Sequence, residues 1–591
     1  MIRILKKHYI AIIPAIILGI LMVLPFFYFR AKLEDNSKGI LPEIVNDENF
    51  YYARIKDVVD GHPFLSNAYL YEHKSGLPQQ VFLAEYLLAQ PIKLFNLNIN
   101  TAHLIYNFLF PVIAFILTYL ALYLISKSRF WAIIFSLFLF FGLYLIDFIR
   151  PVSPQFNFIF WLSQFIFLYL LVNSHNNANQ QIYSNSTNNI SNLRYSHAIR
   201  RLALLGANAL NFGLLFYVYP YYWTFYLIFL ALLTAIYFFN NRALSYKIFS
   251  VIVGGLILAT PYFYLNYLAS KLPEYTETLT RLGLIYSRFP SGIRIVSWSL
   301  LGLLAFGFAI WRKFIKLETK SIFFIFGILT SIIAVNQHLI TGHNIEFSSH
   351  YSMSAIFFLV FAAAYLWQKL RERQNNLKLL SASLIVVFIF IIFLGAFSYL
   401  KQVFILHGED VYRQNYAAIF DWLNKNTAKD SVVYANADLS RLIPVYTADN
   451  VYYIREANLF FISDKEVLDR FIINNFFEKF NKDFITKNVR SVYGVRYIDA
   501  YGHAVQGNKL RRLLGIKPEP EIYLPDQEIV EVISRAKELQ KDSFIKNLKK
   551  YRIDYLIWDK NKNLEWKMDI YFSKKLYENN NFIIYSSFLQ S

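Results

Sequence analysis

Long apolar runs alternate with short polar segments along most of the chain before residue 401. About 20 consecutive apolar residues span the hydrocarbon core of a bilayer, so each long run predicts one transmembrane helix. We expect about eleven such helices, at residues 8–29, 102–125, 131–149, 155–172, 199–219, 221–239, 246–268, 294–312, 321–340, 351–368 and 379–400. The pattern therefore predicts an α-helical polytopic membrane protein with a transmembrane domain at residues 1–400.

The remainder of the chain, residues 401–591, follows a different pattern. Helical periodicity, as in Tyr412–Lys425, alternates there with short runs rich in β-branched and aromatic residues, such as Ser431–Tyr434 and Phe582–Tyr585. Such mixing predicts a small α/β domain. Residues 30–101, after the first apolar run, are also too long and too polar for a simple connector, and we expect them to form a loop with interfacial helices.

Charge sets the expected orientation. The formal net charge is +19, but only 17% of residues are charged and 56% are hydrophobic, which is unusual for a soluble enzyme. The basic residues gather in alternate connections between apolar runs, as at Lys127, Arg242 and Arg371. They therefore indicate cytoplasmic loops and not nucleic acid. An odd number of crossings from a cytoplasmic N-terminus predicts a multi-pass protein of the inner (plasma) membrane with an extracytoplasmic C-terminal domain.

Several classes of function lack support in the residues. The middles of the predicted spans hold essentially no ionisable side chain, which counts against an ion-coupled transporter. The chain has no phosphate-binding Gly-rich loop, no His-Glu-Xaa-Xaa-His motif and no serine elbow, so a nucleotide-driven pump or a common hydrolase is not indicated. Its zero cysteines exclude disulfides and thiolate chemistry. Polar residues lie instead at the outer membrane edge, which favours a site at the lipid–water boundary.

The most informative polar segment is Asn46–Gly61, directly after the first apolar run. It predicts a helix that lies in the membrane interface. Its apolar face consists of Tyr51, Ile55, Val58 and Val59. Asp47 and Glu48 would start this helix beside the bilayer surface. These two residues have a structural and a catalytic interpretation. In the structural one, Asp47 caps the helix and Glu48 complements the helix dipole, and the two effects together stabilise the fold by about 1 kcal/mol.

The catalytic interpretation comes from a resemblance. A first transmembrane helix, an outer loop in which Asp-Glu-Xaa-Xaa-Tyr (Asp47–Tyr51) opens a helix, an Asp60-Gly61 turn, many further spans and an α/β tail together resemble the GT-C superfamily of polyprenyl-phosphate-dependent glycosyltransferases, in particular its bacterial PMT/ArnT-like group. The resemblance implies that Asp47 is the catalytic base or positions the acceptor, with Glu48 as the neighbouring second candidate. It also implies a lipid-linked sugar donor and inversion at the anomeric carbon.

Asp147 and Arg150 form a second candidate group, at the outer junction of the third and fourth predicted spans. Three residues apart, they are expected either to form a local ion pair or to bind substrate. In the second interpretation the resemblance implies that Asp147 touches a metal or the acceptor, and that Arg150 touches the lipid phosphate. The paired acidic motif of some GT-C enzymes is missing here, so a divalent metal is left open.

Histidines and arginines on two further outer connections complete the candidates. His338 and His350 lie within the polar stretch Asn336–Tyr351 and are expected to contact phosphate or sugar, or else to be hydrogen-bonded loop residues. A zinc site from these two with His343 and Glu346 is a minor alternative. Arg288, between Arg281 and Arg294 on the preceding outer loop, is expected to bind an anionic lipid head or to anchor a helix end.

The sequence therefore predicts an enzyme that takes a sugar from a polyprenyl-phosphate-linked donor and attaches it to an extracytoplasmic glycan, lipid or protein acceptor. Two alternatives remain. One is a non-catalytic protein of envelope assembly that binds lipid-linked glycans, and the other is a flippase or transporter of such lipids. The neighbouring acids at positions 47 and 48 favour the transferase.

Overall fold

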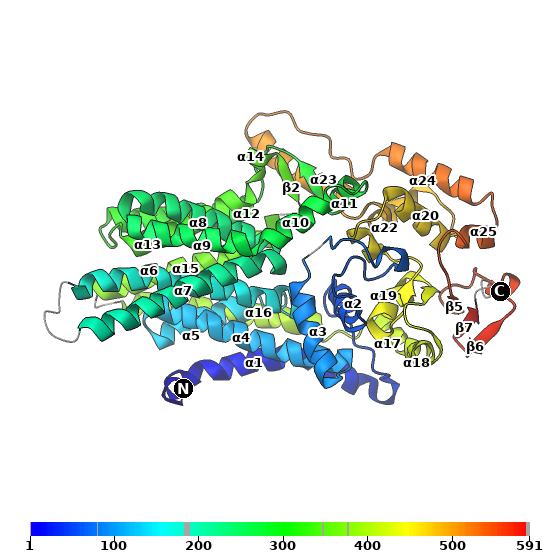
Figure 1. Ribbon diagram of the computed structural model, residues 1–591, viewed down its shortest axis with the longest axis horizontal. Coiled ribbons are helices and arrows are strands. Elements are labelled where there is room, and N and C mark those ends of the chain that lie inside the picture. Colours follow the sequence, from blue (N-terminus) through cyan, green and yellow to red (C-terminus); the bar gives the residue numbers. More distant parts are fainter. Residues whose placement is uncertain (1, 80, 183–189, 346–347, 375–376, 587–591) are drawn as a thin grey trace.

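The computed structural model describes residues 2–79, 81–182, 190–345, 348–374 and 377–586. Figure 1 shows a bundle of long helices that contains the N-terminus and, beside one end of it, a mixed domain that contains the C-terminus. We call the bundle end next to this domain the domain end, and the opposite one the free end.

Within the described residues, eight helices are long and apolar enough to cross a membrane. They are α1 (Ile2–Leu33), α4 (Ile99–Ser126), η4 with α6 (Pro151–Phe156 and Asn157–Ile182), α7 (Ile190–Val218), α8 (Pro220–Asn240), α12 (Ile293–Trp311), α15 (Ser352–Arg373) and α16 (Lys378–Val403). A ninth results if α9 (Arg242–Leu258) and α10 (Thr260–Ala269), bent by 50°, form one span. Membrane character is thus confirmed.

Two shorter apolar helices occupy the remaining predicted positions: α5 (Arg129–Leu137) continued by η3 (Phe138–Leu143), and α13 (Thr319–Val335). Every predicted apolar run therefore coincides with a helix, although length and composition qualify only eight or nine of them as spans. Several starts follow from capping, since the side chains of Asn98, Ser128 and Asn241 accept hydrogen bonds from the first turns of α4, α5 and α9.

Ion pairs join connections that the sequence places on one side of the membrane. Lys127, between α4 and α5, lies 3.2 Å from Glu372 at the end of α15. Lys369 of α15 lies 3.0 Å from Glu318, just before α13. These connections meet at the free end, while the intervening ones meet the mixed domain at the domain end. The alternation fits the predicted topology; which end faces the cytoplasm stays a prediction.

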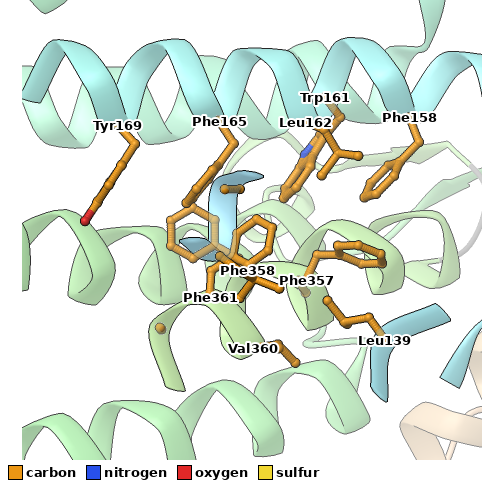
Figure 2. Close-up of a cluster of buried hydrophobic side chains, with 14 of the residues drawn as sticks. Leu139, Phe158, Trp161, Leu162, Phe165, Tyr169, Phe357, Phe358, Val360 and Phe361 are labelled. Atoms are coloured by element: carbon orange, nitrogen blue, oxygen red, sulfur yellow. The ribbon is translucent and has the colours of Figure 1, made fainter. Parts of the chain in front are cut away.

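The bundle core is aromatic. Phe158 and Phe165 of α6 face Phe357 and Phe361 of α15, as Figure 2 shows, with ring centroids 4.6 Å and 4.4 Å apart. Lipid tails are as apolar as these side chains, so close packing and ring geometry, rather than exclusion from water, hold the two helices together.

The C-terminal domain is built on a five-stranded mixed sheet of order β4-β3-β5-β7-β6. Its strands are β3 (Val432–Tyr434), β4 (Asn450–Val451), β5 (Tyr555–Asp559), β6 (Lys575–Glu578) and β7 (Phe582–Ser586). β3 is parallel to β4 and β5, whereas β7 is antiparallel to β5 and β6. Alternate side chains enter two cores, as Val433 and Val432 do on opposite faces.

Helices cover both faces of this sheet. The face of Val433 packs against α18 (Ala417–Asn426) and α19 (Ala437–Tyr446). The other face packs against α20 (Asp464–Asn474), α21 (Lys482–Lys487), α22 (Val489–Tyr493), α24 (Asp526–Leu539) and α25 (Phe544–Leu548). Further helices are α17 (Gly408–Arg413) and α23 (Arg496–Leu513), with short turns η1 (Glu34–Asn36), η2 (Tyr71–His73), η6 (Gln414–Tyr416), η7 (Arg455–Leu459) and η8 (Met568–Ile570). The predicted α/β domain is confirmed.

The first loop belongs to the same core. Its helices are α2 (Glu48–Val59) and α3 (Leu83–Phe95), and α2 is buried between α3 and α19. Its buried charge Arg54 pairs with Glu85 of α3 at 2.9 Å. The apolar face of α2 thus packs on protein, because α19 of the C-terminal domain covers the face left free by α3, and an interfacial position of this loop stays a prediction. The Tyr69 carbonyl even accepts a hydrogen bond from the Val451 N–H of β4.

Two other connections at the domain end pair as strands. Residues 270–292 contain α11 (Tyr275–Arg281) and β1 (Leu284–Tyr286), and the connection after α13 contains α14 (His338–Thr341), β2 (His343–Ile345) and η5 (Ser348–Tyr351). β1 and β2 are antiparallel. Buried Arg281 donates to the Asn458 and Ile462 carbonyls, which ties this pair to the C-terminal domain. We propose that the boundary between the transmembrane domain and the C-terminal domain lies between residues 400 and 401, close to the end of α16 at Val403.

Candidate active site

Asp47 precedes α2 in a left-handed backbone conformation, with φ 71° and ψ 6°. L-residues enter this region at a cost, and Asp and Asn are the side chains that tolerate it best after glycine. The Asp47 side chain makes no capping hydrogen bond to the helix and is 55% exposed. The turn therefore presents a carboxylate that the helix does not use, contrary to the capping interpretation.

Arg150 lies against this carboxylate. Its Nη1 is 3.5 Å from Asp47 Oδ2 and donates to the Asn46 carbonyl at 3.2 Å. Its guanidinium also lies 5.8 Å from the centre of the Tyr51 ring. The expectation of a local pair with Asp147 is wrong: Asp147 is exposed and makes no ion pair in the described part of the chain. Arg150 instead connects the first loop to the junction before η4.

Glu48 has the opposite environment from its neighbour. It is buried, and its Oε2 accepts hydrogen bonds from the Ile44 and Val45 N–H groups at 2.8 and 3.4 Å. Burial, followed by the nearby Glu43 carboxylate, raises the pKa of Glu48 to about 8. It is therefore mostly protonated at neutral pH, and it holds the turn that leads into Asp47.

A small cavity of mixed character lies beside Glu48, and its lining includes Tyr52, His103, Ile99 and Val445. Among the described residues, Glu48 Oε1, the Tyr52 hydroxyl and His103 Nδ1 are buried without a hydrogen-bond partner. Their free polar atoms border one cavity, so a water molecule or a polar group of a ligand would satisfy them together.

A network behind the cavity fixes the state of His103. Gln155 Nε2 donates to Asn107 Oδ1 at 2.7 Å, which leaves Asn107 Nδ2 to donate to His103 Nε2 at 2.8 Å. His103 Nδ1 must then carry the ring proton toward the cavity. These residues were missed from the sequence; the polar pair at i and i+4 within a run that is otherwise apolar is the pattern that could have revealed them.

His350 belongs to a group of tyrosines at the domain end of α7 and α8. Its Nδ1 lies 2.6 Å from the Tyr219 hydroxyl, and its ring stacks on Tyr221 at 4.5 Å. Tyr219 packs against Tyr222 at 4.8 Å. His350 thus lies in an aromatic group with Tyr219, Tyr221 and Tyr222 at the domain end.

His338 and Arg288 lie together elsewhere, at the β1–β2 pair. His338 is fully buried, and its Nε2 donates to the Phe289 carbonyl at 2.8 Å. Arg288 donates to the Leu339 and Ile340 carbonyls at 3.0 and 2.8 Å. Within the described residues neither makes a hydrogen bond or ion pair with the Asp47–Arg150 pair. Both side chains instead bind backbone carbonyls of the opposite connection, and these hydrogen bonds join the connection before α12 to the connection after α13.

A metal site is not assembled among these residues. In the part of the chain that the structure describes, no three His, Asp or Glu side chains gather closely enough to hold an ion. His338 and His350 have the separate partners described above, and the His343 ring packs on Tyr286. Glu346, the carboxylate of the zinc alternative, lies outside the described residues.

Comparison with known proteins gives structural neighbours only. No family model and no curated protein matches the chain. The archaeal oligosaccharyltransferase AglB from Archaeoglobus fulgidus, in complex with an inhibitory peptide and a dolichol-phosphate, is similar over 94% of this chain and 70% of its own, with 13% identity and a TM-score of 0.46. The Archaeoglobus fulgidus oligosaccharyltransferase tethered with an acceptor peptide is similar over 85% and 71%, with 12% identity and a TM-score of 0.41.

Both neighbours are described as oligosaccharyltransferases. At these TM-scores the likeness does not argue for a function. The reaction is therefore argued from the site itself.

Proposed function

We propose that the protein is a GT-C-type glycosyltransferase that moves a sugar from a polyprenyl-phosphate-linked donor to a glycan, lipid or protein acceptor. One observation carries the proposal: the Asp47 carboxylate is exposed, free of the helix it precedes, and 3.5 Å from the Arg150 guanidinium at the domain end. A proton acceptor beside a phosphate-binding cation is the pair of groups that this reaction requires.

In the proposed reaction, Asp47 accepts the proton of the acceptor nucleophile as that atom attacks the anomeric carbon of the donor. The bond from this carbon to the phosphate oxygen breaks, the configuration inverts, and polyprenyl phosphate leaves. Arg150 stabilises the negative charge that develops on the departing phosphate, because a guanidinium can donate two parallel hydrogen bonds to it.

Other residues would support this pair. Glu48 holds the preceding turn through the Ile44 and Val45 N–H groups. As the second candidate for the base it would act only in its ionised form, the minor form at neutral pH. Asp147, exposed and three residues before Arg150, would contact the acceptor or a metal. His350, in its group of tyrosines, would contact the sugar. His338 and Arg288 would act indirectly, by holding the β1–β2 connections.

We further propose that the reaction takes place outside the cytoplasm, at the plasma membrane. The concentration of basic residues at the free end, such as Lys127 and Lys369, supports a cytoplasmic free end. A reporter that is active only in the cytoplasm, fused after Ser591, should be inactive. An active fusion would reverse the topology.

The test of the reaction uses the full chain in lipid nanodiscs with a panel of labelled polyprenyl-phosphate sugars and candidate acceptors. Release of polyprenyl phosphate with an inverted glycosidic product supports the transferase. Donor binding without release would instead identify the protein as a glycan-binding assembly factor. Movement of intact donor between leaflets of proteoliposomes, without release, would identify a flippase.

A further inference from the structure

The last turn of α23 and the residues after it expose several large apolar side chains. Leu513 is 80% exposed and Leu514 is 59% exposed, and Ile516 follows them. Single exposed apolar residues are ordinary on a protein surface, but consecutive ones mark a contact surface. We call residues 509–517 the α23 tip.

Contacts place the α23 tip at the level where transmembrane helices end. The Arg511 guanidinium lies 4.2 Å from the centre of the Phe289 ring, and the Phe289 carbonyl accepts the hydrogen bond of buried His338. Phe289 is four residues before the start of α12 at Ile293, and His338 is three residues after the end of α13 at Val335. Figure 1 accordingly shows α23 reaching back toward α14 and the bundle.

The transmembrane part adds to the same surface. Ile340, whose carbonyl is bound by Arg288, is 79% exposed, and Ile293 at the start of α12 is 61% exposed. Exposed apolar side chains thus occur both on the α23 tip and on the connections next to α12 and α13, and the Arg511–Phe289 contact joins the tip to one of these connections. A band of this kind is what the boundary between lipid tails and headgroups accommodates.

Basic residues accompany these apolar side chains in the chain. They are Lys509, Arg511, Arg512 and Lys517 of the α23 tip and Arg288, which neighbours the Phe289 that Arg511 contacts. The nearby acids are Glu519, which pairs with Arg511, and Glu521, which pairs with Arg512 at 3.2 Å. Lys509 and Lys517 are exposed and have no ion pair within the described residues. The surface therefore keeps an excess of positive charge around an apolar centre.

We propose that the α23 tip is a membrane-docking surface that inserts Leu513 and Leu514 at the headgroup boundary and binds anionic phospholipid headgroups through its basic residues. The charge complements anionic lipid, and the Arg511–Phe289 contact places the tip beside the connection that leads into α12. A second copy of the chain would carry the same positive charge, which disfavours it as the occupant. The C-terminal domain would then be attached to the bilayer at a point distant in sequence from α16.

The absence of cysteine from the chain permits a direct test. Leu513→Cys carries an environment-sensitive fluorophore in full-length protein, with one chain per nanodisc of mixed phosphatidylglycerol and phosphatidylcholine. Val530→Cys is the matched control, because Val530 is an apolar residue of the same domain, 61% exposed on α24. A nitroxide attached to lipid should quench the label at 513 and not at 530, and aqueous iodide should show the reverse preference.

Equal quenching at the two positions would overturn docking. Protection at 513 that appears only in discs loaded with two chains would assign the surface to a protein contact and would also overturn it. Both readouts are independent of the proposed sugar transfer.

A second arm tests the lipid class. In the labelled protein, each of Lys509→Gln and Lys517→Gln should lower the docked-to-undocked ratio about fivefold in anionic discs, because one basic residue near an anionic surface contributes about that factor. Added salt should weaken docking in the parent protein. Docking that is insensitive to both changes, or equally strong in pure phosphatidylcholine, would overturn the role of anionic headgroups. Matching unfolding temperatures of the variants exclude a folding defect.

Discussion

Two arginines, Arg470 in the C-terminal domain and Arg150 at the domain end of the bundle, pair with carboxylates in opposite ways. Arg470 of α20 is fully buried, lies 2.8 Å from Glu466 and 2.9 Å from Glu72, and packs 3.8 Å from the centre of the Tyr551 ring. Arg150 is partly exposed and touches Asp47 at only 3.5 Å. The first arrangement immobilises its charges and joins the first loop to the C-terminal domain. The second leaves both charges available to a ligand, which is the difference expected between a structural pair and a catalytic one.

The largest expected difference between the Asp47–Arg150 pair and the buried Arg470 pair is their effect on the rate of sugar transfer. Asp47→Asn should slow sugar transfer about 10²- to 10⁴-fold, because the amide cannot accept a proton. Stability should stay unchanged, since Asn tolerates the left-handed turn and no capping bond is lost. The measurement is release of polyprenyl phosphate by protein with an unaltered unfolding temperature. Asp35→Asn, an exposed acid of the same loop, is the control, and near-normal turnover by Asp47→Asn would remove Asp47 from the base role.

The buried pair should show the reverse. Arg470→Gln should lower the free energy of unfolding by about 3–5 kcal/mol, because the substitution removes the buried cation shared by the two carboxylates and leaves Glu466 with His73 as its ion-pair partner. Denaturant unfolding in detergent measures this change. Arg490→Gln, an exposed arginine of the same domain, should cost less than about 0.5 kcal/mol. A loss at position 470 no larger than at position 490 would contradict the division into structural and catalytic pairs.

Glu48 supplies a pH-dependent contrast with Asp47. Its pKa is raised from 4.5 to about 8 in the folded protein, so the folded state binds the proton more tightly. The resulting stability is fully present below about pH 4.5 and is lost as pH rises toward 8, by up to about 1.4 kcal/mol per pH unit. Glu48→Gln, which resembles the protonated side chain, should remove this part of the slope. The same slope in Glu48→Gln and in parent protein would refute the assignment; Glu409→Gln, at an exposed acid, should leave it unchanged.

The smallest expected effect is the contribution of the Asp47–Arg150 pair to stability. A double-mutant cycle with Asp47→Asn and Arg150→Gln should give a coupling of about 0.2–1 kcal/mol in unfolding, as for other exposed pairs. The same cycle in turnover should be strongly non-additive, because both residues serve one step. Large coupling in stability, with additive effects on turnover, would make this pair structural.

The sequence was sufficient for the apolar helices and the α/β domain, because a span needs only length and apolar composition and a strand needs only local alternation. It also singled out both segments that meet at the candidate site. It did not predict that they meet: spacing suggested that Arg150 pairs with Asp147, three residues away, whereas its observed partner lies 103 residues earlier. Long-range partners depend on how helices pack, which periodicity does not encode.

Burial was the second failure. Glu48 and His338 were treated as interfacial groups, but the structure buries both. The residues that bury α2 come from α19, nearly 400 positions later, and the carbonyl that binds His338 comes from a different connection. A polar residue in a predicted loop therefore says little about its exposure when several loops share one domain.

The hydrogen bond from Val451 to Tyr69 has a consequence for biosynthesis. About 380 residues separate the two, so at ordinary translation rates the first loop waits roughly 20 to 80 s after its own synthesis for the strand that completes it. During that interval the apolar side of α2 that later contacts α19 has no cover. A ribosome that stalls between α16 and β4 would release a chain with all its membrane helices and an uncovered loop, a species suited to capture by chaperones or proteases. Supplying residues 404–591 as a separate polypeptide should then rescue such chains.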